Sequence, residues 1–222
     1  MERELEKYIL DHSTPEDPVL EDLYRQTHIR FVNPNMACGH IQGKFLEMIS
    51  RMINPMYILE IGTFTGYSSI CLAKGLKPDG VLITVEENDE LTGFTHSYFT
   101  KAGLVSKIVK VTARIQEIAD ELNEEFDLVY IDGDKREYSE YYRLIIDKVR
   151  PGGYIIADNV LWGGKVFDKN TKDQQTKGII EFNDMIRKQK NIENIILPFR
   201  DGLMIIRKGE VRNPMVKGIG KR

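Results

Sequence analysis

The chain has 222 residues, of which 31 are Lys or Arg and 34 are Asp or Glu, and its formal net charge is −3. This length suits one sizeable domain with a buried core, and the slightly acidic balance disfavours nucleic acid as a bulk electrostatic partner. No apolar stretch approaches the roughly 20 residues that a membrane-spanning helix needs. The charged start MERELEKYIL has no signal-peptide core, so we expect a cytoplasmic protein with no membrane partner.

Residues 1–55 are more polar than the rest of the chain, and we interpret them as a helical N-terminal extension of the same domain rather than a second domain. This segment carries four prolines, at Pro15, Pro18, Pro34 and Pro55. The two cysteines of the chain, Cys38 and Cys71, lack the spacing of a metal-binding pair, which favours reduced structural thiols.

From about residue 57 the chain alternates short apolar runs with longer amphipathic ones. The apolar runs are rich in Ile, Val and Leu, which is typical of strands, and lie at residues 56–62, 80–87, 107–113, 125–132 and 152–159. Runs this continuous indicate strands covered on both faces, as in a parallel sheet. The alternation therefore predicts a doubly wound α/β fold for residues 56–208.

The later segments extend this pattern. Residues 135–149 show helical spacing of apolar and aromatic side chains, which predicts a helix with buried tyrosines, namely Tyr138, Tyr141 and Tyr142. Another helix is expected near residues 173–189. The stretch NIILPFRDGLMIIRKG then predicts an antiparallel hairpin around residues 200–202. We interpret the basic segment 209–222 as a solvated tail.

The sequence LEIGTFTGYSS, residues 59–69, follows the first strand and predicts a ligand-binding turn. Gly62 and Gly66 allow close backbone approach, and a helix from about Gly66 would present free N–H groups. The spacing G-x-x-x-G differs from the dinucleotide pattern G-x-G-x-x-G, and no P-loop Lys-Ser/Thr follows. The carboxylate of Glu60 would repel a pyrophosphate but pair with a cationic ligand.

Glu86 ends the second strand, where a carboxylate can accept hydrogen bonds from a ribose diol. The alternative is a solvated strand end, because Glu87 follows directly. Taken with Glu60 and the glycine turn, Glu86 favours a nucleoside that carries a positive charge and no phosphate. S-adenosylmethionine (SAM) has these properties.

Several motifs occur in a fixed order between residues 36 and 208, namely MACGHIQGKFL, LEIGTFTGYS, LITVEEN, YIDGDKREYSEYY, GGYIIADNVLWGGKV and RDGLMIIRK. Together they resemble the cation-dependent class I O-methyltransferases, the family of the catechol and caffeoyl-CoA O-methyltransferases. The resemblance implies a mostly parallel seven-stranded methyltransferase sheet, Rossmann-like, with the last strand antiparallel. Because members of the caffeoyl-CoA type are commonly dimeric, it also implies a homodimer.

The resemblance further implies which residues contact SAM: Met36, Glu60, Gly62, Phe64, Gly66, Ser68, Glu86 and Asp132. Two positions depart from the family pattern. Arg114-Ile115 stands where the family usually has small residues beside the adenine, and Lys44 stands where it often has Gln.

Polar side chains end two neighbouring strands, with Asp132 and Asp134 after the fourth and Asp158 and Asn159 after the fifth. Their oxygens would suit Mg²⁺, Mn²⁺ or Ca²⁺, and the absence of His and Cys among them weighs against zinc. The spacing alone also permits ordinary polar caps, with Asp134 capping a helix that begins near Lys135. The resemblance assigns Asp132, Asp158 and Asn159 as ligands of a divalent cation, with Mg²⁺ favoured.

Lys135 and Trp162 complete the expected site. By resemblance Lys135 is the general base, since burial and a nearby cation both favour a neutral amine, and Trp162 walls the acceptor pocket. The expected activity is O-methylation of a vicinal aromatic diol of catechol or caffeoyl type. Two alternatives are a nucleotide-dependent Rossmann oxidoreductase, which the glycine spacing opposes, and a non-catalytic adenosyl-binding module, which would not need Lys135.

Overall fold

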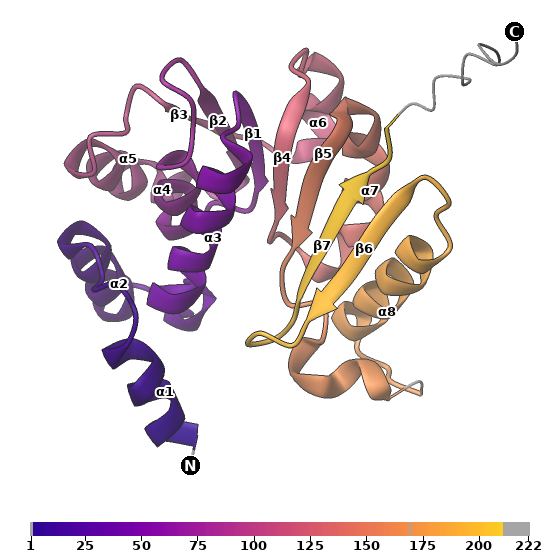
Figure 1. The fold of residues 1–222 in the computed structure, drawn as a ribbon, viewed down its shortest axis with the longest axis horizontal. Coiled ribbons are helices and arrows are strands. Elements are labelled where there is room, and N and C mark those ends of the chain that lie inside the picture. Colours follow the sequence, from indigo (N-terminus) through magenta and orange to yellow (C-terminus); the bar gives the residue numbers. More distant parts are fainter. Residues whose placement is uncertain (1, 169, 211–222) are drawn as a thin grey trace, which may run out of the picture.

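The computed structural model describes residues 2–168 and 170–210, so the expected basic tail lies outside the described residues from 211 onward. The described strands form one seven-stranded sheet in the order β3-β2-β1-β4-β5-β7-β6 (Figure 1). The strands are β1 (Tyr57–Ile61), β2 (Val81–Glu86), β3 (Ile108–Thr112), β4 (Phe126–Ile131), β5 (Val149–Ala157), β6 (Ile192–Leu197) and β7 (Leu203–Lys208). β7 runs antiparallel to both β5 and β6, which confirms the predicted antiparallel last strand and the hairpin.

Helices cover both faces of the sheet (Figure 1). One side carries α2 (Pro18–Arg30), α3 (Gly39–Ile53), α4 (Tyr67–Ala73) and α5 (Thr92–Lys101), and α1 (Glu2–Asp11) extends beyond them. The other side carries α6 (Ile115–Ile118), α7 (Tyr138–Ile145) and α8 (Gln174–Arg187). Within residues 2–168 and 170–210, six short 3₁₀ helices join these elements: η1 (Pro34–Met36), η2 (Asp89–Leu91), η3 (Ala119–Glu121), η4 (Lys135–Glu137), η5 (Ile146–Lys148) and η6 (Trp162–Phe167). Over the described residues, no helix has the length and apolarity to cross a bilayer.

The central strands are apolar on both faces, because each face packs under helices. Ile58 and Leu128 belong to the core that includes side chains of α2, α3, α4 and α5. The next residues along the same strands, Leu59 and Val129, belong to the core that includes α7 and α8. Since successive strand residues point to opposite faces, a strand buried on both sides must be apolar throughout, as the sequence predicted.

Two elements differ from the sequence-based expectation. The expected helix over 135–149 consists of the 3₁₀ turn η4, the α-helix α7 and the 3₁₀ turn η5. β5 begins at Val149 rather than 152, because Val149 pairs with Phe126 ahead of an irregularity in the ladder. Polar and glycine residues follow Val149, so the apolar pattern did not indicate that the strand begins there. The tyrosines of α7 are buried, as expected from their spacing.

The order of the sheet places a crevice between the ends of β1 and β4. The chain leaves β1 toward β2 and leaves β4 toward β5, on opposite sides, so the carboxyl ends of the two strands are left uncovered. Gly62 follows β1 with φ +97°, and a Cβ atom there would lie 2.3 Å from the carbonyl oxygen of Asp132. The glycine therefore permits the backbones after β1 and β4 to approach each other.

Gly62→Ala should lower the free energy of unfolding by about 2–4 kcal/mol, because it combines a left-handed φ with a backbone clash. Urea denaturation measures this change. The matched control is Gly93→Ala in α5, where an added Cβ would meet nothing within 4 Å. That variant should match or slightly exceed the wild type in stability, since alanine favours helix. Equal losses in the two variants would contradict the close-approach argument.

Candidate active site

A cavity of about 660 Å³ lies at the carboxyl ends of the central strands. Ten residues proposed from sequence line it: Met36, Gly62, Phe64, Ser68, Glu86, Asp132, Lys135, Asp158, Asn159 and Trp162. Two others, Glu60 and Gly66, do not belong to its lining. The strand order thus collects residues that are more than 120 positions apart in the chain into one chamber.

Gly66 shapes the turn before α4 and does not face the cavity. It has φ +87°, and a Cβ atom there would lie 2.6 Å from the ring of Phe99. Phe64, in the same turn, also has a positive φ of 46° and donates its backbone N–H to Oε2 of Glu86 over 2.8 Å. This hydrogen bond fixes the turn to the end of β2. Gly66 allows the left-handed conformation of the turn and its close packing against Phe99.

Glu86 stands at the end of β2 with its carboxylate held in place. Besides the N–H of Phe64 on Oε2, the N–H of Asn88 donates to Oε1 over 3.0 Å. Each carboxylate oxygen can accept more than one hydrogen bond, so both retain capacity for a donor in the cavity. A carboxylate with two free acceptor positions could accept hydrogen bonds from both hydroxyls of a ribose diol.

Glu60 lies fully buried behind the cavity wall. Its Oε2 accepts hydrogen bonds from the hydroxyls of Ser69 and Thr84, and its Oε1 has no partner among the described residues. Burial raises the pKa of this carboxyl to about 7, although the hydroxyls of neighbouring Ser and Thr residues oppose the rise. Glu60 is therefore a buried acid one layer away from the lining formed by Ile61 and Gly62.

Asp132 and Asp158 are brought together by the pairing of β4 with β5. Ile131 pairs with Ala157 in register, and the N–H of Asp158 donates to the carbonyl oxygen of Ile131 over 3.0 Å, so the two aspartates follow adjacent positions. Burial raises the pKa of the Asp132 carboxyl; the ammonium of Lys135 opposes this rise and the charge of Asp158 adds to it. Two carboxylates thus share a poorly solvated site.

Asp158 is held from several directions. The hydroxyl of Tyr130 donates to its Oδ2 over 2.8 Å, the side chain of Gln42 donates to the same oxygen, and the N–H of Asn159 donates to Oδ1 over 2.7 Å. In the part of the chain that the structure describes, no group of three or more His, Cys, Asp or Glu forms a metal cluster. A cation here would depend on Asp132, Asp158 and the amide of Asn159, a hard-oxygen donor set that fits Mg²⁺ or Mn²⁺.

Lys135 is buried in the same chamber. Its Nζ donates to Oδ1 of Asp132 over 2.7 Å and to the hydroxyl of Tyr138 over 2.8 Å. Asp134 caps η4, accepting the N–H of Arg136 over 2.9 Å, which is the capping role that the sequence left open for it. The cap fixes the first residue of η4, and that residue is Lys135.

Trp162 follows β5 in a loop that contains several residues with positive φ. It has φ +48°, and Gly163 and Gly164 after it also have positive φ. Its ring centroid lies 6.0 Å from Nζ of Lys135. The indole therefore forms a wall beside the lysine.

Sequence reasoning missed the link between Asp158 and the β6–β7 hairpin. Arg200, at that hairpin, donates to Oε1 of Gln42 over 3.0 Å and to the carbonyl oxygen of Cys38, while Gln42 holds Asp158. One signal was present: Gln42 stands one helical turn before the buried Leu46, so a polar side chain lies on the apolar face of α3. No local pattern pointed to Arg200.

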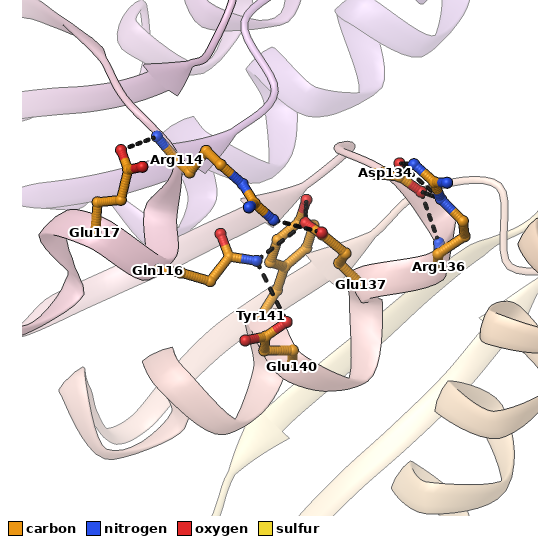
Figure 2. Close-up of polar contacts among 8 residues, drawn as sticks. All are labelled: Arg114, Gln116, Glu117, Asp134, Arg136, Glu137, Glu140 and Tyr141. Carbon is orange, nitrogen blue, oxygen red and sulfur yellow. Dashed lines mark hydrogen bonds and ion pairs between the residues drawn. The ribbon is translucent and has the colours of Figure 1, made fainter.

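Sequence reasoning also did not identify Gln116. This residue lines the far end of the cavity, beside Arg114 in the turn after β3. The Oε1 atom of Gln116 is buried and has no hydrogen-bond partner among the described residues. Its Nε2 donates to the carboxylates of Glu137 and Glu140 (Figure 2). This oxygen is therefore an unsatisfied acceptor inside the cavity wall.

The pKa of Glu60 gives a pH-dependent stability. The ordinary value is 4.5 and the folded value is about 7, so between these pH values the folded protein binds a proton that the unfolded chain lacks. Stability contributed by the neutral acid is present below about pH 4.5 and is lost as pH rises toward 7. In urea denaturation, the stability of Glu60→Gln relative to wild type should therefore rise by about 3 kcal/mol between about pH 4 and pH 8. A relative stability that stays constant over this range would contradict the assignment.

Comparison with known proteins agrees with the motifs. The O-methyltransferase family profile matches residues 10–209. A catechol O-methyltransferase of Niastella koreensis is 36% identical over 168 residues, covering 74% of this chain and 76% of the relative. A probable caffeoyl-CoA O-methyltransferase of Dictyostelium discoideum is 31% identical over 90% of both chains. The crystal structure of the O-methyltransferase TomG from Streptomyces achromogenes, in complex with SAM, has a TM-score of 0.86 at 30% identity, covering 93% of this chain and 96% of that one. This chain is therefore an enzyme of the O-methyltransferase family, as its ordered motifs predicted.

Proposed function

We propose that this protein transfers the methyl group of SAM to one hydroxyl of a vicinal aromatic diol, with a divalent cation bound beside the diol. The observation that carries the proposal is the pairing of two features in one cavity. Glu86 offers a fixed acceptor at the β2 end, and the Asp132–Lys135–Asp158 cluster lies at the β4 and β5 ends. The names of the catechol and caffeoyl-CoA relatives support a diol as the acceptor.

SAM would lie across the strand ends, with its ribose on Glu86 and its methionine end near Asp132. Gly62, Phe64 and Ser68 line the intervening wall, and Met36 lies at the rim with its side chain exposed. The SAM complex of TomG, whose fold matches over most of this chain, supports this placement. Glu60 would act from behind the wall, as a buried acid whose charge a bound sulfonium or ammonium group favours.

Asp132, Asp158 and Asn159 would hold the cation, because they are hard oxygen donors on adjacent strand ends. The two carboxylates supply two negative charges, which match a divalent ion. When bound, such a cation supplies positive charge that makes a neighbouring hydroxyl more acidic. Gln42 and Tyr130 would keep Asp158 oriented toward it.

As a neutral amine, Lys135 would accept the proton of the reacting hydroxyl. Its Nζ is held by Asp132 and Tyr138, so it occupies a defined position with little rotational freedom. Trp162 would stack against the aromatic ring of the acceptor and exclude water from one side. Holding the hydroxyl, the lysine and the methyl donor in one geometry would contribute much of the rate acceleration.

The homodimer implied by the family resemblance stays a proposal. Its support is apolar surface on the N-terminal helices: Leu5 and Tyr8 of α1 and Met48 and Met52 of α3 are between 57% and 71% exposed. A second copy of the chain would cover such surface.

The function is tested by assaying methyl transfer from radiolabelled SAM to a panel of catechol-type diols, with the matched monophenols as controls. Diols should be methylated, monophenols should not, EDTA should abolish turnover, and Mg²⁺ or Mn²⁺ should restore it. Full activity in excess chelator would contradict the proposed requirement for a divalent cation. Tight binding of S-adenosylhomocysteine without turnover of any diol would favour an adenosyl-binding module.

Lys135→Met should lower kcat by about 10²–10⁴-fold, the usual range for loss of a positioned general base, and should leave the affinity for S-adenosylhomocysteine nearly unchanged. Steady-state kinetics and calorimetry measure the two quantities. Lys177→Met, at an exposed lysine of α8, is the control and should behave as wild type. A Lys135 variant with near-normal kcat would exclude the lysine as the base.

A further inference from the structure

The two oxygens of the Asp158 carboxylate differ in how many hydrogen bonds they already accept. Asp158 lines the cavity but is only 4% exposed, so most of its partners come from the protein. Its Oδ2 accepts from the hydroxyl of Tyr130 over 2.8 Å and from Nε2 of Gln42, and its Oδ1 accepts from the N–H of Asn159 over 2.7 Å. Because each carboxylate oxygen has two lone-pair positions, Oδ2 is fully occupied and Oδ1 keeps one free position.

The amide of Gln42 is held in one orientation from its other end. Nη1 of Arg200 donates to Oε1 of Gln42 over 3.0 Å. A guanidinium only donates hydrogen bonds and an ionised carboxylate only accepts them, so a flipped amide would lose its bonds to both Arg200 and Asp158. Gln42 is 2% exposed, where unmatched polar atoms are costly. The amide therefore presents a donor, Nε2, to Asp158.

Arg200 is itself fixed between the β6–β7 hairpin and α3. Its φ of +48° is a left-handed conformation that side-chain-bearing residues seldom adopt. Such a conformation persists where the surrounding structure enforces it. Nη1 of Arg200 also donates to the carbonyl oxygen of Cys38, the residue before α3, and Gln42 lies near the start of that helix. The hairpin and the start of α3 thus hold the amide of Gln42 together.

We propose that Gln42, anchored by Arg200, is a positioning residue that leaves Asp158 one acceptor position, on Oδ1, for a bound cation and so makes the site favour Mg²⁺ over Ca²⁺. The inference rests on the proposed function, in which Asp158 is a ligand of that cation. A carboxylate that binds through one oxygen suits the small octahedral shell of Mg²⁺. The larger and more flexible shell of Ca²⁺ can also use both oxygens of a carboxylate, which the occupied Oδ2 prevents.

The test measures cation affinities of the full chain in the absence of a methyl acceptor. Electron paramagnetic resonance of free Mn²⁺ follows the binding of that ion, and competition with Mn²⁺ gives the dissociation constants of Mg²⁺ and Ca²⁺. Wild type should bind Mg²⁺ about 10-fold more tightly than Ca²⁺. Gln42→Met keeps a side chain of similar size but cannot donate to Asp158, which frees one position of Oδ2. The preference for Mg²⁺ should then fall to within about 2-fold.

A second variant reaches the same oxygen independently. Tyr130→Phe frees the other position of Oδ2 and should relax the preference in the same direction. The matched control is Tyr98→Phe in α5. The hydroxyl of Tyr98 also donates to a carboxylate oxygen over 2.8 Å, Oδ2 of Asp22, but neither residue lines the cavity. This control should keep the wild-type ratio of the two dissociation constants.

Three outcomes would overturn the proposal: a wild type that binds Ca²⁺ as tightly as Mg²⁺, a Gln42→Met variant with unchanged affinities, or a Gln42→Met variant in which both affinities fall in proportion. The last of these is the signature of a purely structural role. If wild type binds no divalent cation, the cation of the proposed function fails together with this inference. If the affinities change as described but no diol is methylated, this inference stands and only the proposed acceptor chemistry fails.

Discussion

The close approach of the backbones after β1 and β4 is the constraint on which the rest of the site depends. At Gly62 there is no room for a side chain, because a Cβ atom would meet the carbonyl group of Asp132, and the φ of +97° is one that L side chains rarely adopt. The glycine lets β1 end in a tight turn that is hydrogen-bonded to Glu86, while β4 is followed by Asp132 and then by η4. One achiral residue thus lets the turn held by Glu86 and the cluster around Asp132 form parts of the same cavity.

The site also concentrates acids in poorly solvated positions. Glu60 is fully buried behind the wall, and Asp132 and Asp158 stand side by side at its centre. Burial favours the neutral forms of Glu60 and Asp132, and the apolar cores on both faces of the sheet maintain that burial. Native proteins tolerate such local costs at functional positions, where a bound cation or cationic ligand relieves them.

A single short turn, η4, connects the two ends of the cavity. It begins with Lys135, which contacts Asp132, and ends with Glu137, which contacts Arg114 and Gln116 at the far end. Asp134 caps the turn, and Tyr138 at the start of α7 packs edge-on against Phe182 of α8. The same local structure therefore orients Lys135 near the carboxylates and the amide of Gln116 at the far end of the cavity.

The sequence by itself determined the class of fold and the chemistry of the strand ends. Continuous apolar runs required strands covered on both faces, and the glycine and carboxylate residues at the ends of those runs had to gather at one edge. This is how Gly62, Glu86, Asp132 and Asp158 could be placed at that edge. Only the tertiary structure decided which side chains meet across the molecule. It placed Glu60 behind the wall, joined Arg200 to Gln42 across 158 positions, and joined Gln116 to Glu137 across 21. The physical reason is that periodicity encodes which face of an element is buried, whereas contacts between elements depend on how whole helices and strands pack, and no local pattern records that.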